Sequence, residues 1–214
     1  MRSMGQYWSC RQSKFVVLFR EQLHSWFRIH PLRNKEFIMA VWNVIDHTEL
    51  SGTASSYDVT SISASYDHLY LKYSARSDKS AYRDFPKVTL NADTGTNYSA
   101  TYLFTGTSTP SSYRGTGKTG IEDIEMTASS ATADTFGVGI LWIPYYSNSA
   151  NFKQILVGSA AEGATTTDYQ WGLNVVAGLW SDTSAVDQIT LTPQSGDDFV
   201  QYSTFTLYGI NGAG

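Results

Sequence analysis

Charge is scarce in this chain of 214 residues, since only 16% of its residues are Asp, Glu, Lys or Arg. An ordinary soluble domain carries about 25%. Basic residues are scarcest after residue 38, where the chain has eight Lys or Arg and seventeen Asp or Glu. Because phosphate contacts need clustered cations, we expect no nucleic-acid partner for this part of the chain.

Cysteine and long apolar runs are also rare. Cys10 is the only cysteine, so no intrachain disulfide can form and stability has to come from packing, oligomerisation or metal. The apolar run at residues 15–19 has five residues. A transmembrane helix needs about 20 apolar residues, and the apolar region of a signal peptide about 7–15. The sequence therefore predicts no disulfide scaffold and no membrane span.

Residues 1–38 differ from the rest of the chain, with seven Lys or Arg and only two Asp or Glu. An amphipathic helix fits residues 13–29, before Pro31 interrupts the pattern. Three interpretations compete. The favoured one is that Met39 is the true start and that a translated upstream region precedes it. The others are an arm that docks on a partner and, least favoured, a membrane-surface helix. We therefore divide the chain into an N-terminal extension, either helical or non-native, and a β-sandwich domain over residues 39–214.

From Trp42 onward the dominant pattern is a period of two, which is typical of half-buried strands. Near the end of the chain, for example, Phe205 and Leu207 alternate with Thr, which places both on one face. Turn clusters rich in Gly, Asn, Asp and Ser separate the segments, and no long helical pattern lies between them. The predicted strands are residues 57–62, 68–75, 87–90, 98–104, 121–127, 135–143, 152–159, 168–176, 189–192 and 204–210. This pattern predicts an all-β fold, an antiparallel two-sheet jelly-roll-like β-sandwich.

The longest stretch without alternation covers residues 105–120, and we expect it to be a loop that joins two strands. It contains Gly115-Thr-Gly-Lys-Thr119, which resembles part of a P-loop. The full pattern requires a glycine where this chain has Ser112, and a helix directly after the motif. We therefore expect a mobile loop and no nucleotide site.

Metal-binding patterns are incomplete. The only histidines after residue 38 are His47 and His68, and neither belongs to a zinc-ligand spacing. The acidic turns at residues 93–97 and 195–198 lack the spacing and the closing glutamate of a calcium-binding EF-hand loop. We predict no metal and no cofactor.

Catalytic patterns are equally incomplete. Paired carboxylates, as in Glu122, Asp123 and Glu125, could serve glycoside hydrolysis, but we interpret them as a solvated strand face. No serine has the surroundings of a hydrolase nucleophile. We predict no catalytic residues and no enzymatic activity.

Aromatic residues are plentiful, with fourteen Tyr and six Trp. Tyr113 lies in the expected long loop, and Tyr145 and Tyr146 follow Pro144 at the end of a strand. Exposed aromatic rings can stack on sugars or contact another copy of the chain. These three tyrosines are the candidate surface-contact residues.

Four segments carry a resemblance to a known class of proteins: residues 66–77, 90–99, 178–189 and 203–210. Taken in order along the chain, these segments resemble small structural proteins of tailed-bacteriophage virions. The resemblance covers about residues 40–210. The resemblance implies a jelly-roll-like module of a tail fibre, a head fibre or a capsid decoration, and modules of this kind are often trimers. It defines no functional residues that could be carried over to this chain.

Taken together, these observations predict a virion structural protein that acts by self-association and docking. A neutral surface rich in Tyr, Ser and Thr lowers the cost of desolvation in such contacts. The expected partners are further copies of the chain, with a trimer favoured, and other virion proteins. The alternative is a carbohydrate-binding, lectin-like β-sandwich with glycans as partners.

Overall fold

The computed structural model describes residues 41–105, 109–162 and 172–212. These residues form antiparallel sheets that pack as a β-sandwich, which confirms the predicted all-β fold. Their only helical element is a single 3-10 turn, η1 (Gln194–Gly196). The extension predicted for residues 1–38 lies outside the described residues.

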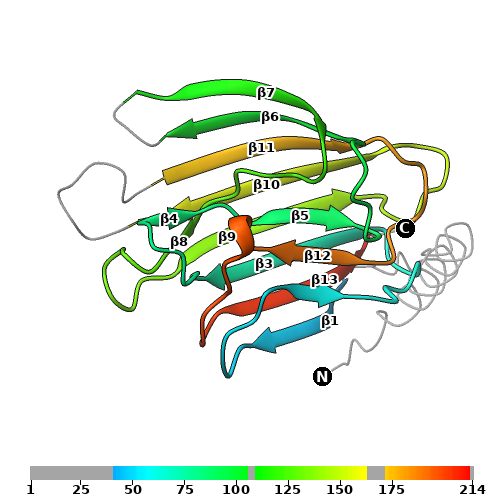
Figure 1. The fold of residues 1–214 in the computed structure, drawn as a ribbon. Helices are drawn as coiled ribbons and strands as arrows, with labels where there is room; N and C mark the ends of the chain where they lie inside the picture. The colour runs from blue at the N-terminus through cyan, green and yellow to red at the C-terminus, as the bar shows by residue number, and fades with distance from the viewer. Residues whose placement is uncertain (1–40, 106–108, 163–171, 213–214) are drawn as a thin grey trace, which may run out of the picture. The chain divides into compact units, whose positions relative to one another are not determined.

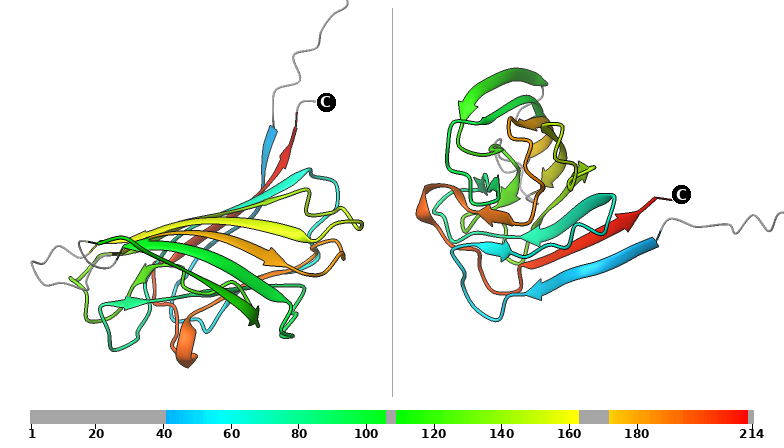
Figure 2. Two further views of the ribbon diagram at one scale, coloured as in Figure 1. Left: turned by 90° about the horizontal axis from the view of Figure 1, so that it is seen from above. Right: turned by 90° about the vertical axis from the view of Figure 1, so that its right-hand side faces the viewer.

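One layer is an eight-stranded antiparallel sheet (Figure 1). Across the sheet, its strands are β1 (Val41–Glu49), β13 (Thr204–Asn211), β3 (His68–Ala75), β9 (Gly137–Pro144), β10 (Lys153–Ala161), β11 (Gly172–Trp180), β6 (Tyr98–Thr105) and β7 (Ser111–Lys118). The sheet is twisted and curved, and its concave side faces the smaller sheets (Figure 2). Such a twist follows from the chirality of the backbone.

The other layer consists of two small sheets. One contains β2 (Tyr57–Val59), β12 (Ile189–Thr192) and β5 (Lys87–Leu90), and the other pairs β4 (Arg83–Asp84) with β8 (Met126–Thr127). The core lies between the layers, where Leu71 and Leu141 of the large sheet and Leu191 of the small sheet are buried in one hydrophobic cluster. The alternation of buried and more exposed residues along β9, β10 and β11 contributes to this single apolar layer.

Several sequence predictions match the structure closely. Strands β3, β5 and β12 have the predicted bounds, and Phe205 and Leu207 of β13 are fully buried in the core. The ring of Phe205 stacks on that of Tyr57 with 4.5 Å between the ring centroids. The period of two therefore assigned the buried face of β13 correctly.

The strand predicted at residues 121–127 is mostly wrong. Ile121 forms only an isolated bridge to Val88, and regular pairing is limited to β8. Between them Asp123 has a φ of +55°, a left-handed conformation that interrupts an extended strand. The start of the strand predicted at residues 168–176 lies outside the described residues, and the strand ends later than predicted, because β11 runs on to Trp180.

The long loop predicted at residues 105–120 is also wrong, because residues 111–118 form β7, which pairs with β6 along the edge of the large sheet. The Ser, Arg and Gly residues of β7 have low strand propensity and show no apolar alternation, so nothing in the local sequence predicts a strand there. The P-loop-like residues Gly115 to Lys118 belong to this strand, and the described residues directly after them form no helix. The geometry of a nucleotide-binding P-loop is therefore missing.

Candidate functional site

Two of the three candidate tyrosines lie at the turn that follows β9. Tyr145 is 66% exposed, and its ring packs edge-on against that of His68, with 4.9 Å between centroids. Tyr146, in contrast, is fully buried, and its hydroxyl donates a hydrogen bond to the carbonyl oxygen of Ser63. The prediction of Tyr146 as a surface-contact residue is wrong. The φ of +48° at Tyr145 turns the chain, so that consecutive tyrosines have different surroundings.

The third candidate, Tyr113, belongs to β7 and is 41% exposed. Its ring stacks on that of Tyr102 in the neighbouring strand, with 4.4 Å between centroids and 15° between planes. Phe104 packs edge-on against it at 6.0 Å, and the Tyr113 hydroxyl donates to the carboxylate of Asp123. Three contacts therefore hold this ring in place while much of it remains open to solvent.

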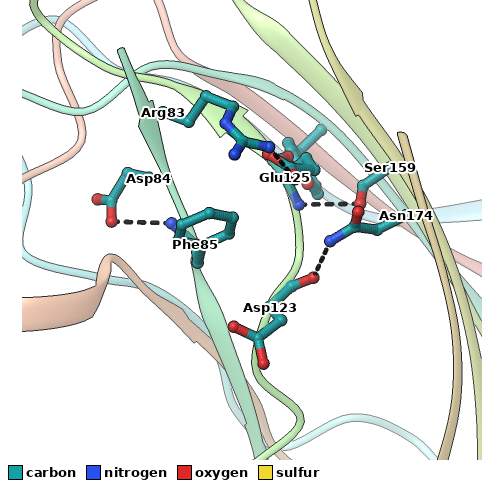
Figure 3. Close-up of polar contacts among 8 residues, drawn as sticks. Arg83, Asp84, Phe85, Asp123, Glu125, Ser159 and Asn174 are labelled. Carbon is teal, nitrogen blue, oxygen red and sulfur yellow. Dashed lines mark hydrogen bonds and ion pairs between the residues drawn. The ribbon is translucent and has the colours of Figure 1, made fainter. Parts of the chain in front are cut away.

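Tyr113 forms one wall of an open pocket of about 140 Å³. The pocket lies on the inner side of β6, β7 and β11, next to β4 and the segment before β8, and Figure 3 shows its polar groups. Its lining combines four aromatic and four polar side chains: Phe85, Tyr102, Phe104, Tyr113, Arg83, Asp123, Glu125 and Asn174. Aromatic walls with a few convergent polar groups are typical of small-molecule sites.

An ion pair belongs to the lining of this pocket. Arg83 Nη1 lies 2.8 Å from Glu125 Oε1, and the side chain of Glu125 is only 1% exposed. Burial raises the pKa of Glu125 to about 7, although Arg83 opposes that shift. The backbone around Glu125 is fixed as well, because its N–H donates to Ser159 Oγ at 2.9 Å and its carbonyl accepts from the Tyr73 hydroxyl at 2.6 Å.

The start of β11 makes room for this ion pair. A Cβ atom at Gly172 would lie 2.4 Å from Glu125 Oε1 and 2.5 Å from Arg83 Nη1. A larger residue would therefore have to displace one of these two groups from its position in the ion pair.

Three buried oxygen atoms of the pocket lining lack a hydrogen-bond partner among the described residues: Tyr102 Oη, Glu125 Oε2 and Asn174 Oδ1. The other end of the Asn174 amide is engaged, since its Nδ2 donates to the carbonyl oxygen of Asp123 at 2.6 Å. Figure 3 shows Asp123, Glu125 and Asn174 next to each other. Unpartnered buried oxygens are costly in a protein interior unless another molecule supplies the donor.

Sequence reasoning did not identify this pocket. It interpreted Glu125 as part of a solvated strand face, which is wrong, since Glu125 is buried. Arg83 and Asn174 lie in β4 and β11, strands that are far apart in the sequence, and neither stands in a recognisable motif. One signal was present, because Asn174 is a polar residue on the inward-facing side of an otherwise apolar strand.

A second feature lies on the convex side of the large sheet. We define the outer apolar face as the outward side chains of Leu103, Val138, Ile140, Trp142, Leu156, Leu173 and Val175, which are 40–54% exposed. They come from β6, β9, β10 and β11, and cross-strand pairing makes them neighbours, as in Trp142 opposite Leu156 and Val175 opposite Leu103. No outward side chain of these four strands carries a charge.

Aromatic residues extend this face over the adjoining strands β3, β13 and β1. Trp42 packs edge-on against Tyr70 and Tyr208, with ring centroids 5.0 Å and 5.6 Å away. Tyr70 lies directly opposite Trp142 in the strand pairing, so the aromatic cluster is continuous with the outer apolar face. Lys72 Nζ lies 5.2 Å from the centre of the Tyr208 ring, so one positive charge adjoins this cluster.

Comparison with protein-family models, curated proteins and solved structures identifies no match to this chain. Within residues 41–105, 109–162 and 172–212, no group of three or more His, Cys, Asp or Glu is arranged to hold a metal ion. The same residues contain no helix that is long and apolar enough to cross a membrane.

Proposed function

We propose that this protein is a structural module that works by self-association and docking, and that the outer apolar face is its contact surface between copies. The observation that carries the proposal is the chemistry of this face. An antiparallel sheet with one solvated side normally alternates apolar residues inward with polar residues outward. In β9, β10 and β11, outward positions are also apolar, as Ile140, Leu156 and Val175 illustrate.

The size of this surface supports contact with a second copy. The outer apolar face spans four strands that lie about 4.8 Å apart, and about five residues along each strand with a rise of about 3.4 Å per residue. Its projected area is therefore roughly 300 Å². The aromatic cluster of Trp42, Tyr70 and Tyr208 extends the surface to seven strands, or roughly 600 Å² in plan. Protruding side chains add accessible area, which brings the surface close to the 800 Å² or so per partner that a stable interface buries.

A second copy fits this face better than a charged partner. The outward side chains of β6, β9, β10 and β11 offer no charge that could form an ion pair across an interface. Apolar contacts between identical surfaces need no such complementarity, and contiguous apolar patches on proteins commonly mark interaction sites.

The wider context that we propose is a virion, with the module in a tail fibre, a head fibre or a capsid decoration. This part of the proposal rests on the resemblance of residues 66–77, 90–99, 178–189 and 203–210 to structural proteins of tailed bacteriophages. A trimer is the favoured assembly, and other virion proteins are the expected docking partners.

The test is the mass of the full chain in solution, measured by light scattering over a range of concentrations. We expect an oligomer for the native chain. Leu156 lies on β10, in the middle of the outer apolar face, so Leu156→Lys should give a folded monomer. The matched control is Tyr202→Lys, because Tyr202 is exposed at a turn before β13 and should leave the oligomer intact.

A native chain that stays monomeric at all concentrations would overturn the proposal, as would an oligomer that Leu156→Lys leaves unchanged. The virion context has its own test, which is electron microscopy and protein analysis of phage particles that carry this protein. Absence from every particle would remove that context while leaving self-association to be judged by the mass measurement.

The second candidate function is a carbohydrate-binding module. One observation favours it, namely the pocket in which the aromatic ring of Tyr113 lies beside the buried polar groups of Glu125 and Asn174. A monomeric native chain that binds a glycan would make this candidate the better one.

A further inference from the structure

We propose that the pocket lined by Tyr113, Glu125 and Asn174 binds one ring of a neutral sugar. The pocket lies on the inner side of the strands whose outward residues form the outer apolar face. The two surfaces are therefore separate, and this proposal does not depend on self-association.

The aromatic side of the pocket suits the C–H face of a sugar ring. Tyr113 is fixed by stacking on Tyr102, by edge contact with Phe104 and by its hydrogen bond to Asp123. A ring that is already held in place loses little conformational entropy when a ligand packs against it. Because Tyr113 is still 41% exposed, it offers apolar surface that a ligand can cover.

The polar side of the pocket suits hydroxyl groups. Glu125 Oε2 and Asn174 Oδ1 are buried oxygens without a partner among the described residues, so each can accept a hydrogen bond from a ligand. Neighbouring hydroxyls of a sugar could serve both acceptors. A hydroxyl also donates and accepts equally well, so it can pair with the Glu125 carboxyl whether that group is ionised or protonated.

The charges of the pocket disfavour an ionic ligand. The guanidinium of Arg83 is already paired with Glu125, and Asp123 adds a negative charge, so an anion would find no free cation among the described residues of the lining. A quaternary ammonium ion would need several open aromatic faces. Arg83 itself lies over the ring of Phe85, 5.4 Å from its centre, and Tyr102 is covered by Tyr113.

The size of the pocket limits the ligand to one ring. Its volume of about 140 Å³ is well below the 300–1,000 Å³ or so of pockets that enclose drug-sized molecules. We therefore infer that the pocket holds a single sugar ring, which can be the end of a longer glycan that continues into solvent.

The test is an NMR titration of the full chain with the methyl glycosides of glucose, galactose, mannose and N-acetylglucosamine. We expect at least one of them to shift the side-chain amide signals of Asn174, with millimolar affinity. Tyr113→Ala should weaken this binding about tenfold, because it removes the aromatic platform. Tyr113→Phe keeps the ring and should bind within a few-fold of the native chain.

Tyr82→Ala is the matched control, because Tyr82 is 40% exposed but does not line the pocket. It should bind as the native chain does. The proposal is overturned if none of the four glycosides shifts the Asn174 signals, if choline or acetate shifts them in place of a glycoside, or if Tyr113→Ala binds normally. Leu156→Lys separates this proposal from self-association, because that variant should lose the oligomer and keep the sugar.

Discussion

The two sides of strands β6 and β11 carry different chemistry. On the outward side, Leu103, Leu173 and Val175 contribute exposed apolar side chains to the outer apolar face. On the inward side, Phe104 and Asn174 line the pocket with an aromatic ring and an unpartnered amide oxygen. Adjacent residues of one strand therefore serve two separate surfaces, and the assignment of each residue depends only on the register.

This comparison shows why polarity alone is a poor guide to the faces of this sheet. The usual signal places apolar residues inside and polar residues outside. In β11 the outward Val175 is apolar and the inward Asn174 is polar, so the usual signal is locally reversed. Neither an exposed apolar face nor a buried amide without a partner stabilises an isolated monomer, which is why both proposals rest on these strands.

The largest difference is expected between two variants that place a charge on opposite sides of one strand. Val157 is fully buried on the inward side of β10, next to the exposed Leu156. Val157→Lys should cost about 5 kcal/mol or more, because it buries an unpaired charge. Leu156→Lys should change stability by less than about 1 kcal/mol. Urea denaturation and light scattering of both variants provide the measurement, and equal losses of stability would contradict the assigned register.

The next largest effect is expected in the aromatic part of the core. Phe205 is fully buried and lies between Tyr57 and Phe199, with ring centroids 4.5 Å and 5.0 Å away. Phe205→Ala should cost about 3–5 kcal/mol. Val175→Ala, on the outward side of β11, should cost less than about 1 kcal/mol. Thermal denaturation of the two variants would show melting temperatures that differ by several degrees, and similar values would contradict this prediction.

A smaller effect should appear in the pH dependence of stability. Glu125 has its pKa raised from 4.5 to about 7 by burial, so the folded chain retains a proton that the unfolded chain releases. The stabilising contribution of this proton is complete below about pH 4.5 and is lost as the pH rises to about 7. The free energy of unfolding should decrease by about 3 kcal/mol over this range.

Glu125→Gln cannot ionise, so this decrease in the free energy of unfolding should disappear in that variant. Urea denaturation midpoints of the native chain and of Glu125→Gln, measured at intervals between pH 4.5 and 7.5, would show whether the decrease is lost in the variant. Glu49→Gln is the control, since Glu49 is exposed and should leave the slope unchanged. A slope that persists in Glu125→Gln would assign the effect to another group.

The smallest effect is expected from removal of residues 1–38. The net charge of residues 1–38 and the spacing of their apolar residues differ from those of the rest of the chain. We therefore predict that residues 1–38 are dispensable for folding. A chain that starts at Met39 should melt within a few degrees of the full chain, because loss of a core element would cost several kcal/mol. A large drop in the melting temperature would show that these residues stabilise the sandwich.

Much of the fold could be predicted from the sequence. The period of two identified β3 and β12, in which buried residues alternate with more exposed ones, and the first half of β13, where Phe205 and Leu207 alternate with Thr. It failed at β7, whose small polar residues pair along an edge without filling the core. The strand propensity of such residues is low, and only the partner strand β6 provides the backbone pairing that holds them extended.

Little of the candidate site could be predicted. Tyr113 was identified as an exposed aromatic residue, but its position beside Glu125 depends on how β7 and the segment before β8 meet in space. Tyr146 was misplaced because the left-handed turn at Tyr145 has no clear sequence signal. Arg83 and Glu125 are separated by 42 residues, and nothing local in the sequence indicates that they pair.

The pairing of β1 with β13 has a consequence for biosynthesis. Val41 lies opposite Asn211, and β13 separates β1 from β3 in the sheet. While the chain is being synthesised, β3 can pair with β9 on one side, but its other edge has no neighbour until the residues of β13 leave the ribosome. Contacts over such a long separation are typical of slow-folding proteins. The nascent chain therefore presents an open strand edge until β13 has been synthesised, and chaperone binding or premature contact between copies can occur at this edge in that interval.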